Sequence, residues 1–177
     1  MPSALARQPP ARPNRFKLSA GLGPSLALGV APQLTGLGRI FVSGRLDGLS
    51  LELAADAALP ATRRQADGSG FSLNRFAAGA AACGHVQAFA ACLTGTLGRL
   101  EARGLGVDQP ASPSGLFSQL GVRIAARHDF GDRYFAGARL EGLVMLSPWT
   151  VTLDDTAAWR TPRIGGLIGL DFGMNFL

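Results

Sequence analysis

The first candidates for chemistry in this 177-residue chain are charged side chains. They lie in segments where apolar residues alternate with small or polar ones, and they share the face opposite the apolar residues. If the segments enclose a narrow space, these ions must be paired, because an unpaired buried charge is costly. A structural salt-bridge network is the simpler interpretation. The alternative is a path for protons or small solutes, which would favour anions because basic residues outnumber acidic ones. The set comprises Lys17, Arg39, Arg45, Glu52, Asp56, Arg123, Arg127, Arg139, Glu141, Arg163 and Asp171.

The two cysteines, Cys83 and Cys92, are a second candidate. They flank a predicted turn at Gly84-His85, and their odd separation lets them face each other across a hairpin. We therefore predict a disulfide, which an oxidising compartment permits; two buried thiols are the alternative. We expect no metal site, because His85 is the only nearby histidine and no second Cys or His pair supplies the four ligands of zinc.

Catalytic groupings are harder to find. Nucleophilic catalysis needs a positioned nucleophile and base, yet His85 and His128 both fall at predicted turns or rims. Paired glycines such as Gly21 and Gly23 lack the following helix that a dinucleotide fingerprint requires. We therefore expect neither an enzyme nor a bound cofactor.

Composition narrows the class of protein. The chain has 16% charged residues, 47% apolar residues and 24 Gly, whereas soluble domains have about 25% charged residues and about 7% Gly. This excludes disorder for most of the chain. The basic residues are scattered singly rather than clustered as in nucleic-acid-binding proteins, so we expect no nucleic-acid partner.

The length suggests one domain, which we place at residues 16–177. Residues 1–15 are rich in Pro and Arg without an apolar period, which predicts a flexible basic arm. No signal peptide is visible in this sequence.

Apolar residues alternate with small or polar ones from Phe16 onward, which predicts strands between two different media. Asp47-Gly48 joins two such segments and is a strong hairpin signal. The Ala-rich stretch from Phe76 to Gly98 is the best helical alternative, and a face swap at Arg75-Phe76 predicts a β-bulge. The face predicted to contact lipid comprises Phe16, Leu18, Leu22, Leu26, Leu28, Val30, Ile40, Val42, Leu49, Leu51, Leu53, Leu120, Val122, Ile124, Tyr134, Leu140, Val144, Ile164, Ile168, Leu170, Phe172, Met174 and Phe176.

The alternation divides into eight segments of roughly 10 to 15 residues, enough for tilted membrane strands of about 9 to 11 residues plus extensions. Tight connections are expected at 47–48, 83–86 and 130–132, and long polar ones at 60–69, 102–115 and 148–162. Trp149 and Trp159, in the last long connection, fit either membrane-interface anchors or loop-packing residues. The pattern predicts an all-β fold: a membrane-spanning, antiparallel, up-and-down β-barrel of eight strands with a lumen just wide enough for side chains.

Three stretches carry a resemblance to a known family: ACGHVQAFAAC with the following LTGTLGRLEARG, then LFSQLGVRIAARHDFGDRYFAGARLEGL, and the ending RIGGLIGLDFGMNFL. They resemble the small eight-stranded outer-membrane barrels of the OmpA/OmpX type, and more closely the short Gly/Ala/Arg-rich barrel proteins of myxobacteria and related bacteria. The resemblance implies a monomer in the bacterial outer membrane and supplies no shared catalytic motif.

We therefore expect a non-enzymatic integral outer-membrane barrel with a structural or surface-interaction role, its loops displayed outside the cell. One alternative is a narrow, anion-favouring conduit. A second is a soluble lipocalin-like ligand-binding barrel with the apolar face inward, whose outer coat of Gly, Ser and Ala would be a poor surface in water.

Outer-membrane lipid is the expected partner. Lipopolysaccharide phosphates are a further candidate, because Arg forms bidentate bonds to phosphate. A solvated loop surface is the simpler interpretation of the loop arginines, which are Arg63, Arg64, Arg103 and Arg160.

Overall fold

The structure is a computed structural model that describes residues 16–64, 70–105, 113–153 and 156–176. The predicted basic arm of residues 1–15 lies outside this part of the chain. Among the described residues, no helix is long and apolar enough to cross a bilayer. The strands are β1 (Phe16–Leu28), β2 (Thr35–Leu46), β3 (Leu49–Ala58), β4 (Ala61–Arg64), β5 (Gly70–Val86), β6 (Phe89–Leu105), β7 (Ser114–Phe130), β8 (Tyr134–Met145), β9 (Thr150–Leu153), β10 (Thr156–Arg160) and β11 (Ile164–Asn175).

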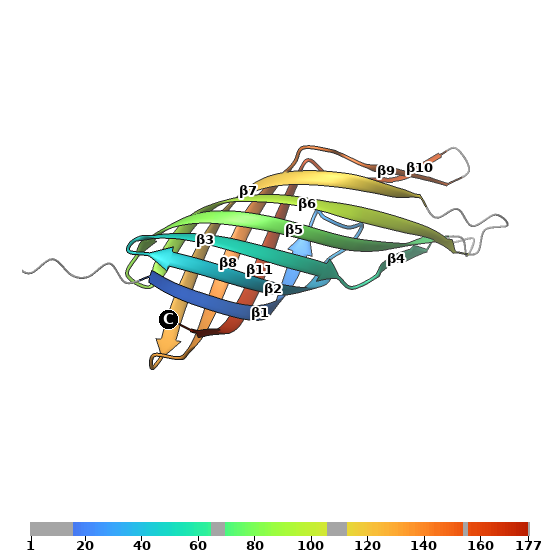
Figure 1. The fold of residues 1–177 in the computed structure, drawn as a ribbon. Helices are drawn as coiled ribbons and strands as arrows, with labels where there is room; N and C mark the ends of the chain where they lie inside the picture. Colours follow the sequence, from blue (N-terminus) through green and yellow to red (C-terminus); the bar gives the residue numbers. More distant parts are fainter. Residues whose placement is uncertain (1–15, 65–69, 106–112, 154–155, 177) are drawn as a thin grey trace, which may run out of the picture.

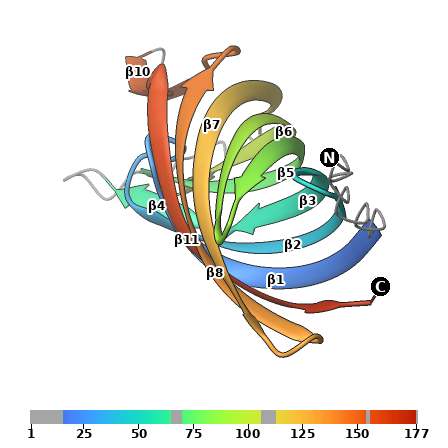
Figure 2. The ribbon, with the colours of Figure 1, turned by 90° about the vertical axis from the view of Figure 1, so that its left-hand side faces the viewer.

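The strands form a closed antiparallel barrel, which confirms the predicted fold class (Figures 1 and 2). The barrel closes where β1 pairs with β11, with Leu22 opposite Phe172. β3 and β4 pair with successive parts of β5 and together act as one barrel strand, so the barrel has eight strands. β9 and β10 form a separate hairpin within the connection from β8 to β11.

The tight turns gather at one end of the barrel, here called the turn end, and β4, β9 and β10 lie at the opposite loop end (Figure 1). At the turn end, Asp47 has a φ of 53°, the left-handed conformation that a two-residue hairpin turn requires. The turn predicted at 83–86 is wrong, because β5 continues to Val86 and the chain turns at Gln87-Ala88, with Gln87 at a φ of 55°. Cys83 and Cys92 therefore lie within paired strands.

The Ala-rich stretch from Phe76 to Gly98 forms parts of β5 and β6, not a helix. The predicted β-bulge is also wrong, because Arg75 pairs with Leu100 and Phe76 with Arg99 in unbroken register. Arg75 points inward and is 5% exposed, whereas Phe76 points outward and is 56% exposed. The backbone therefore keeps its alternation through this point. The apolar residues change from the inward face, as at Leu73, to the outward face, as at Phe76, because the surroundings of the strand change.

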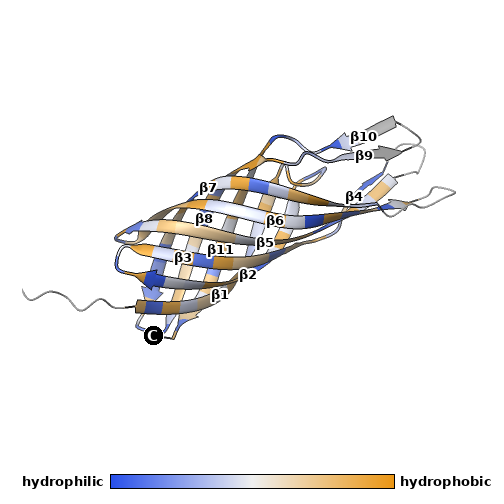
Figure 3. Ribbon diagram, turned by 45° about the horizontal axis from the view of Figure 1, so that its top comes forward, coloured by the Kyte–Doolittle hydropathy of each residue, from blue (hydrophilic) through white to orange (hydrophobic). Residues whose placement is uncertain are grey.

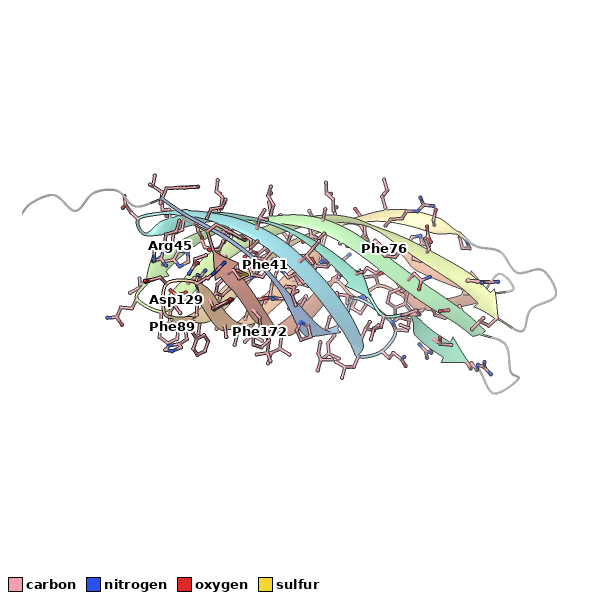
Figure 4. The ribbon with its side chains drawn as sticks, turned by 60° about the horizontal axis from the view of Figure 1, so that its bottom comes forward. Phe41, Arg45, Phe76, Phe89, Asp129 and Phe172 are labelled. Carbon is pink, nitrogen blue, oxygen red and sulfur yellow. A yellow bond between two sulfur atoms is a disulfide. The ribbon has the colours of Figure 1, made fainter. Side chains whose placement is uncertain are left out.

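Hydrophobic and hydrophilic residues alternate along the strands (Figure 3). Phe172 projects away from the barrel, whereas Phe41 lies inside (Figure 4). The side chains predicted to face lipid are 38% to 75% exposed except for Val30 and Met174, and Met174 is half-buried.

Val30 is a correction to the predicted lipid face, since only 2% of it is exposed. β1 ends at Leu28, and Gly29, with a φ of 75°, changes the direction of the chain. Val30 then packs in a buried cluster with Leu37 and Leu143 instead of continuing the outward row.

Candidate functional site

A network of charged side chains fills the middle of the barrel. Arg123 on β7 donates from Nη1 to Glu52 Oε1 on β3 at 2.6 Å, and from Nε to Glu141 Oε2 on β8 at 2.8 Å. Glu141 also accepts a hydrogen bond from Thr94 Oγ1 at 2.6 Å. Because β5 and β6 separate β3 from β7 in the sheet, the contact between Arg123 and Glu52 crosses the lumen.

Arg39 and Arg139 extend this network to other strands. Arg39 Nη2 donates to Glu52 Oε1 at 2.5 Å, and its Nη1 lies 3.9 Å from Asp56 Oδ1. Arg139 on β8 donates to Asp171 on β11. The two arginine side chains are 5% and 1% exposed. Opposite charges at these distances compensate one another where water is scarce.

The other predicted lumen residues lie at the ends of the barrel. Arg127 donates to Asn175 Oδ1 at 2.6 Å, and Arg45 is half-buried, both toward the turn end. Lys17 and Arg163 are exposed, which corrects their assignment to the lumen. Lys17 is the second residue of β1 and Arg163 precedes β11, and at the rims both faces of a strand meet water.

Arg75 is a buried charge that the sequence analysis did not assign to the lumen, because the expected bulge obscured its direction. It is 5% exposed, and its guanidinium carbon lies 4.8 Å from the centre of the Phe117 ring. With Arg75 included, acidic and basic residues are equal in number at the centre of the lumen, so the predicted basic excess is not found there. This central set is Arg39, Arg75, Arg123 and Arg139 with Glu52, Asp56, Glu141 and Asp171.

Glycines on the inward face make room for the large side chains. A Cβ placed on Gly98 would lie 2.4 Å from the Phe117 ring, and one on Gly173 would lie 2.5 Å from the Phe135 ring. A small barrel fills its interior by alternating small and large residues in this way, which accounts for part of the glycine content. The directly opposed pairs are Gly21 with Phe41, Gly23 with Arg39, Gly98 with Phe117, Gly137 with Arg127, Gly169 with Arg139, and Gly173 with Phe135.

An apolar cluster fills the lumen at the loop end. Here β5, β6 and β7 turn apolar side chains inward and polar ones such as Asn74 outward. Trp149 and Trp159 pack against the cluster, which identifies them as loop-packing residues. Its buried members are Ala31, Ala61, Phe71, Leu73, Ala77, Leu100, Ala102 and Phe117.

Small cavities remain within the lumen among the described residues. One of about 110 Å³ lies toward the turn end, between Arg123 and the mouth at Arg127 and Asp129. Another of about 20 Å³ lies among Arg75, Gln119 and Arg123. The charged network therefore stands between the larger cavity and the apolar cluster.

The structure joins Cys83 to Cys92 in a disulfide between directly opposed positions of β5 and β6. Nearby, Ser50 Oγ lies 2.7 Å from His85 Nε2, a contact that sequence reasoning missed because it placed His85 in a turn. Within the described ranges, no carboxylate lies in salt-bridge distance of His85, so the pair lacks the acidic member of a catalytic triad. In the same ranges, no group of three or more acidic, His or Cys side chains could hold a metal.

Solved outer-membrane barrels are similar to this chain in structure. Neisserial surface protein A is 14% identical over 91% of this chain and 97% of its own, with a TM-score of 0.56. The N-terminal barrel of Pseudomonas aeruginosa OprF is 13% identical over 92% of this chain and 98% of its own, with a TM-score of 0.53.

The attachment invasion locus protein Ail of Yersinia pestis is 12% identical over 92% of this chain and 99% of its own, with a TM-score of 0.59. No protein-family model and no curated protein sequence matches the chain. The chain therefore has the fold of the small eight-stranded outer-membrane β-barrels.

Proposed function

We propose that this chain is an integral outer-membrane barrel with a structural or surface-interaction role that is not enzymatic. Its rigid barrel holds the loop-end extension, which is the level of the apolar cluster together with β4, β9 and β10, and the connections there outside the cell. The filled lumen carries this proposal: Phe117 in the apolar cluster, Arg123 in the charged network and Arg127 at the mouth follow one another along β7. A barrel filled at successive levels acts through its outer surfaces.

The outward face supports the membrane location. Large apolar side chains such as Leu51, Leu93 and Ile164 are 70% or more exposed, and such a surface is unfavourable in water. The same observation corrects the lipocalin-like alternative, which needs the apolar face to line the interior. The solved barrels of similar structure are outer-membrane proteins, which also supports this location.

The conduit alternative has less support. Glu52 and Glu141 are paired with Arg39 and Arg123 at 2.5 to 2.8 Å, and the formal charges of the central set cancel. Planar-bilayer recording of the refolded chain tests this directly: we expect no steady current, because the side chains fill the lumen. A steady, anion-selective current would establish a conduit and overturn the plugged barrel.

Surface display is tested with a peptide epitope inserted between β6 and β7, at the loop end. We expect an antibody to label intact cells that export the protein. The matched control carries the same epitope at Asp47-Gly48, at the turn end, and should be labelled only after the outer membrane is opened. The reverse pattern, or no labelling of intact cells by either variant, would contradict the proposed display.

A further inference from the structure

A trough runs along the outer surface of β5. From residue 78 to residue 84, every outward position of this strand carries Ala or Gly. The neighbouring strands place larger side chains beside it, with Leu53 on β3 opposite Ala80 and Leu97 on β6 opposite Ala78. At Ala78, its position nearest the loop end, the trough opens into an apolar hollow of about 870 Å³, whose lining also includes Ala55, Phe76, Leu97 and Arg99.

Arg99 marks the loop end of the trough. It lies directly opposite Phe76 on β5 and Leu116 on β7, both of which point outward. Its guanidinium donates from Nη2 to Ser114 Oγ at 3.1 Å, and its Nε lies 3.0 Å from Glu101 Oε1. The side chain is 58% exposed, and it lines the hollow. At membrane interfaces, Arg side chains lay the apolar stem along apolar surface and keep the charged head in water.

The charge at this end favours an anionic partner. Arg103, four residues farther along β6, is exposed on the same face as Arg99 and Glu101. Two guanidinium groups and one carboxylate therefore leave a net positive charge where the apolar surface ends. Arg binds phosphate through paired, charge-assisted hydrogen bonds.

We propose that this trough is a lipid-binding site: it holds one acyl chain of lipid A, the phosphorylated anchor of lipopolysaccharide, and Arg99 binds the lipid phosphate. The inference rests on the proposed membrane function and assigns a ligand class to one face of the barrel. The loop end faces the outer leaflet in the proposed orientation, which selects lipid A over a phospholipid of the inner leaflet. Small residues give the acyl chain space between the ridges formed by Leu53 and Leu97.

A second copy of the chain is the competing occupant, since small residues also let transmembrane elements approach closely. A barrel contact on this face would remove Arg99 and Arg103 from water with only one carboxylate, that of Glu101, to pair with them. The positive charge left unpaired is unfavourable. A phosphorylated lipid matches both parts of the site, because its acyl chain is apolar and its phosphate is an anion, and we therefore assign the trough to the lipid.

Native mass spectrometry of the full chain tests the assignment. The chain is refolded in detergent, then titrated with lipid A and, separately, with phosphatidylglycerol. Ala78→Leu fills the trough, and Arg99→Gln removes the charge. Their matched controls are Ala138→Leu, at an exposed outward position of β8, and Arg163→Gln, an exposed arginine at the loop end. Heat-dependent gel migration first verifies that each variant is folded.

We expect the wild type to retain one lipid A more tightly than phosphatidylglycerol. Arg99→Gln should weaken lipid A binding about tenfold, as expected for the loss of hydrogen bonds to a charged group. Ala78→Leu should weaken binding of both lipids, and both controls should match the wild type.

Three outcomes would overturn the assignment: equal retention of the two lipids by the wild type, equal effects of Ala78→Leu and Ala138→Leu, or a wild-type dimer that Ala78→Leu dissociates. Failure of the proposed function looks different, because the chain would then fold as a soluble monomer without detergent.

Discussion

Two regions of this barrel have opposite polarity. In the part of the barrel around the charged network, here called the belt, apolar side chains such as Leu93 point outward and Arg123 points inward. In the loop-end extension, Leu73 points inward, whereas Asn74 on the outward face is polar and half-buried. Both regions keep the same period of two, and β5 passes from one to the other in unbroken register. The comparison shows that alternating apolar and polar residues indicate a strand with an apolar environment on one side and a polar one on the other. The pattern does not say whether the apolar side is the interior or the outer surface.

The two interiors are consequently stabilised in different ways. The belt encloses ions that require partners, whereas the extension encloses side chains that require close packing. Substitutions in the two interiors should therefore lower stability for different reasons, by loss of ion pairs in the belt and by loss of packing in the extension.

The largest effect is expected for Arg123→Ala in the belt. It leaves Glu141 without its ion-pair partner and Glu52 with Arg39 alone, and an unpaired buried charge lowers the unfolding free energy by about 3 to 5 kcal/mol. Urea titration in lipid vesicles, followed by gel migration, measures this. Arg127→Ala is the control, because that side chain is 28% exposed and its loss should change stability by at most about 1 kcal/mol. Equal effects would show that the network does not stabilise the belt.

Phe117→Ala tests the apolar interior of the extension. The ring is 4% exposed and lies against Gly98 and Arg75, so its removal should lower the unfolding free energy by about 3 kcal/mol through lost packing. The same urea titration applies. Phe130→Ala, at a ring that is 56% exposed, should cost less, and the reverse order would contradict a packed cluster at the loop end.

An arginine on the outward face should distinguish the two media. Leu120→Arg places a charge in the apolar belt, where Leu120 is 54% exposed, and should cost about 2 kcal/mol, as for charges on the lipid face of barrels. Asn74→Arg places it on the outward face of the extension and should be nearly neutral. Folding yields in vesicles compare the two variants, and similar losses for both would place the extension in lipid.

The smallest effect is expected for the double variant Cys83→Ser, Cys92→Ser. The disulfide links positions that the hairpin already pairs, and its cysteines are separated by only nine positions in the sequence, so its loss should cost about 1 to 2 kcal/mol. Reducing conditions should lower the unfolding free energy of the wild type by the same amount, which the urea titration shows as a lower midpoint. A midpoint that reducing conditions leave unchanged would show that the disulfide contributes nothing to stability.

Much of the fold was predictable because the cues are local. The pleat alone places Ile40 and Val42 on one face and Arg39 on the other, and Asp47-Gly48 carries its own turn signal. The prediction of a bulge was wrong because it assumed that the outward face of β5 is apolar along its whole length. Leu167 is an apolar residue on the inward face of β11, among small and polar ones. It packs with Leu143 and Met145 in a buried cluster, because the interior at this level is apolar.

The sequence by itself determined that strands alternate between two media, and with it the direction of most side chains, because that depends only on the neighbouring residues of each strand. Only the tertiary structure decided which inward side chains meet. Arg123 and Glu52 are 71 residues apart and belong to strands that do not pair. They meet because strand number and stagger set the width of a closed barrel, and no local pattern encodes a distance across its lumen.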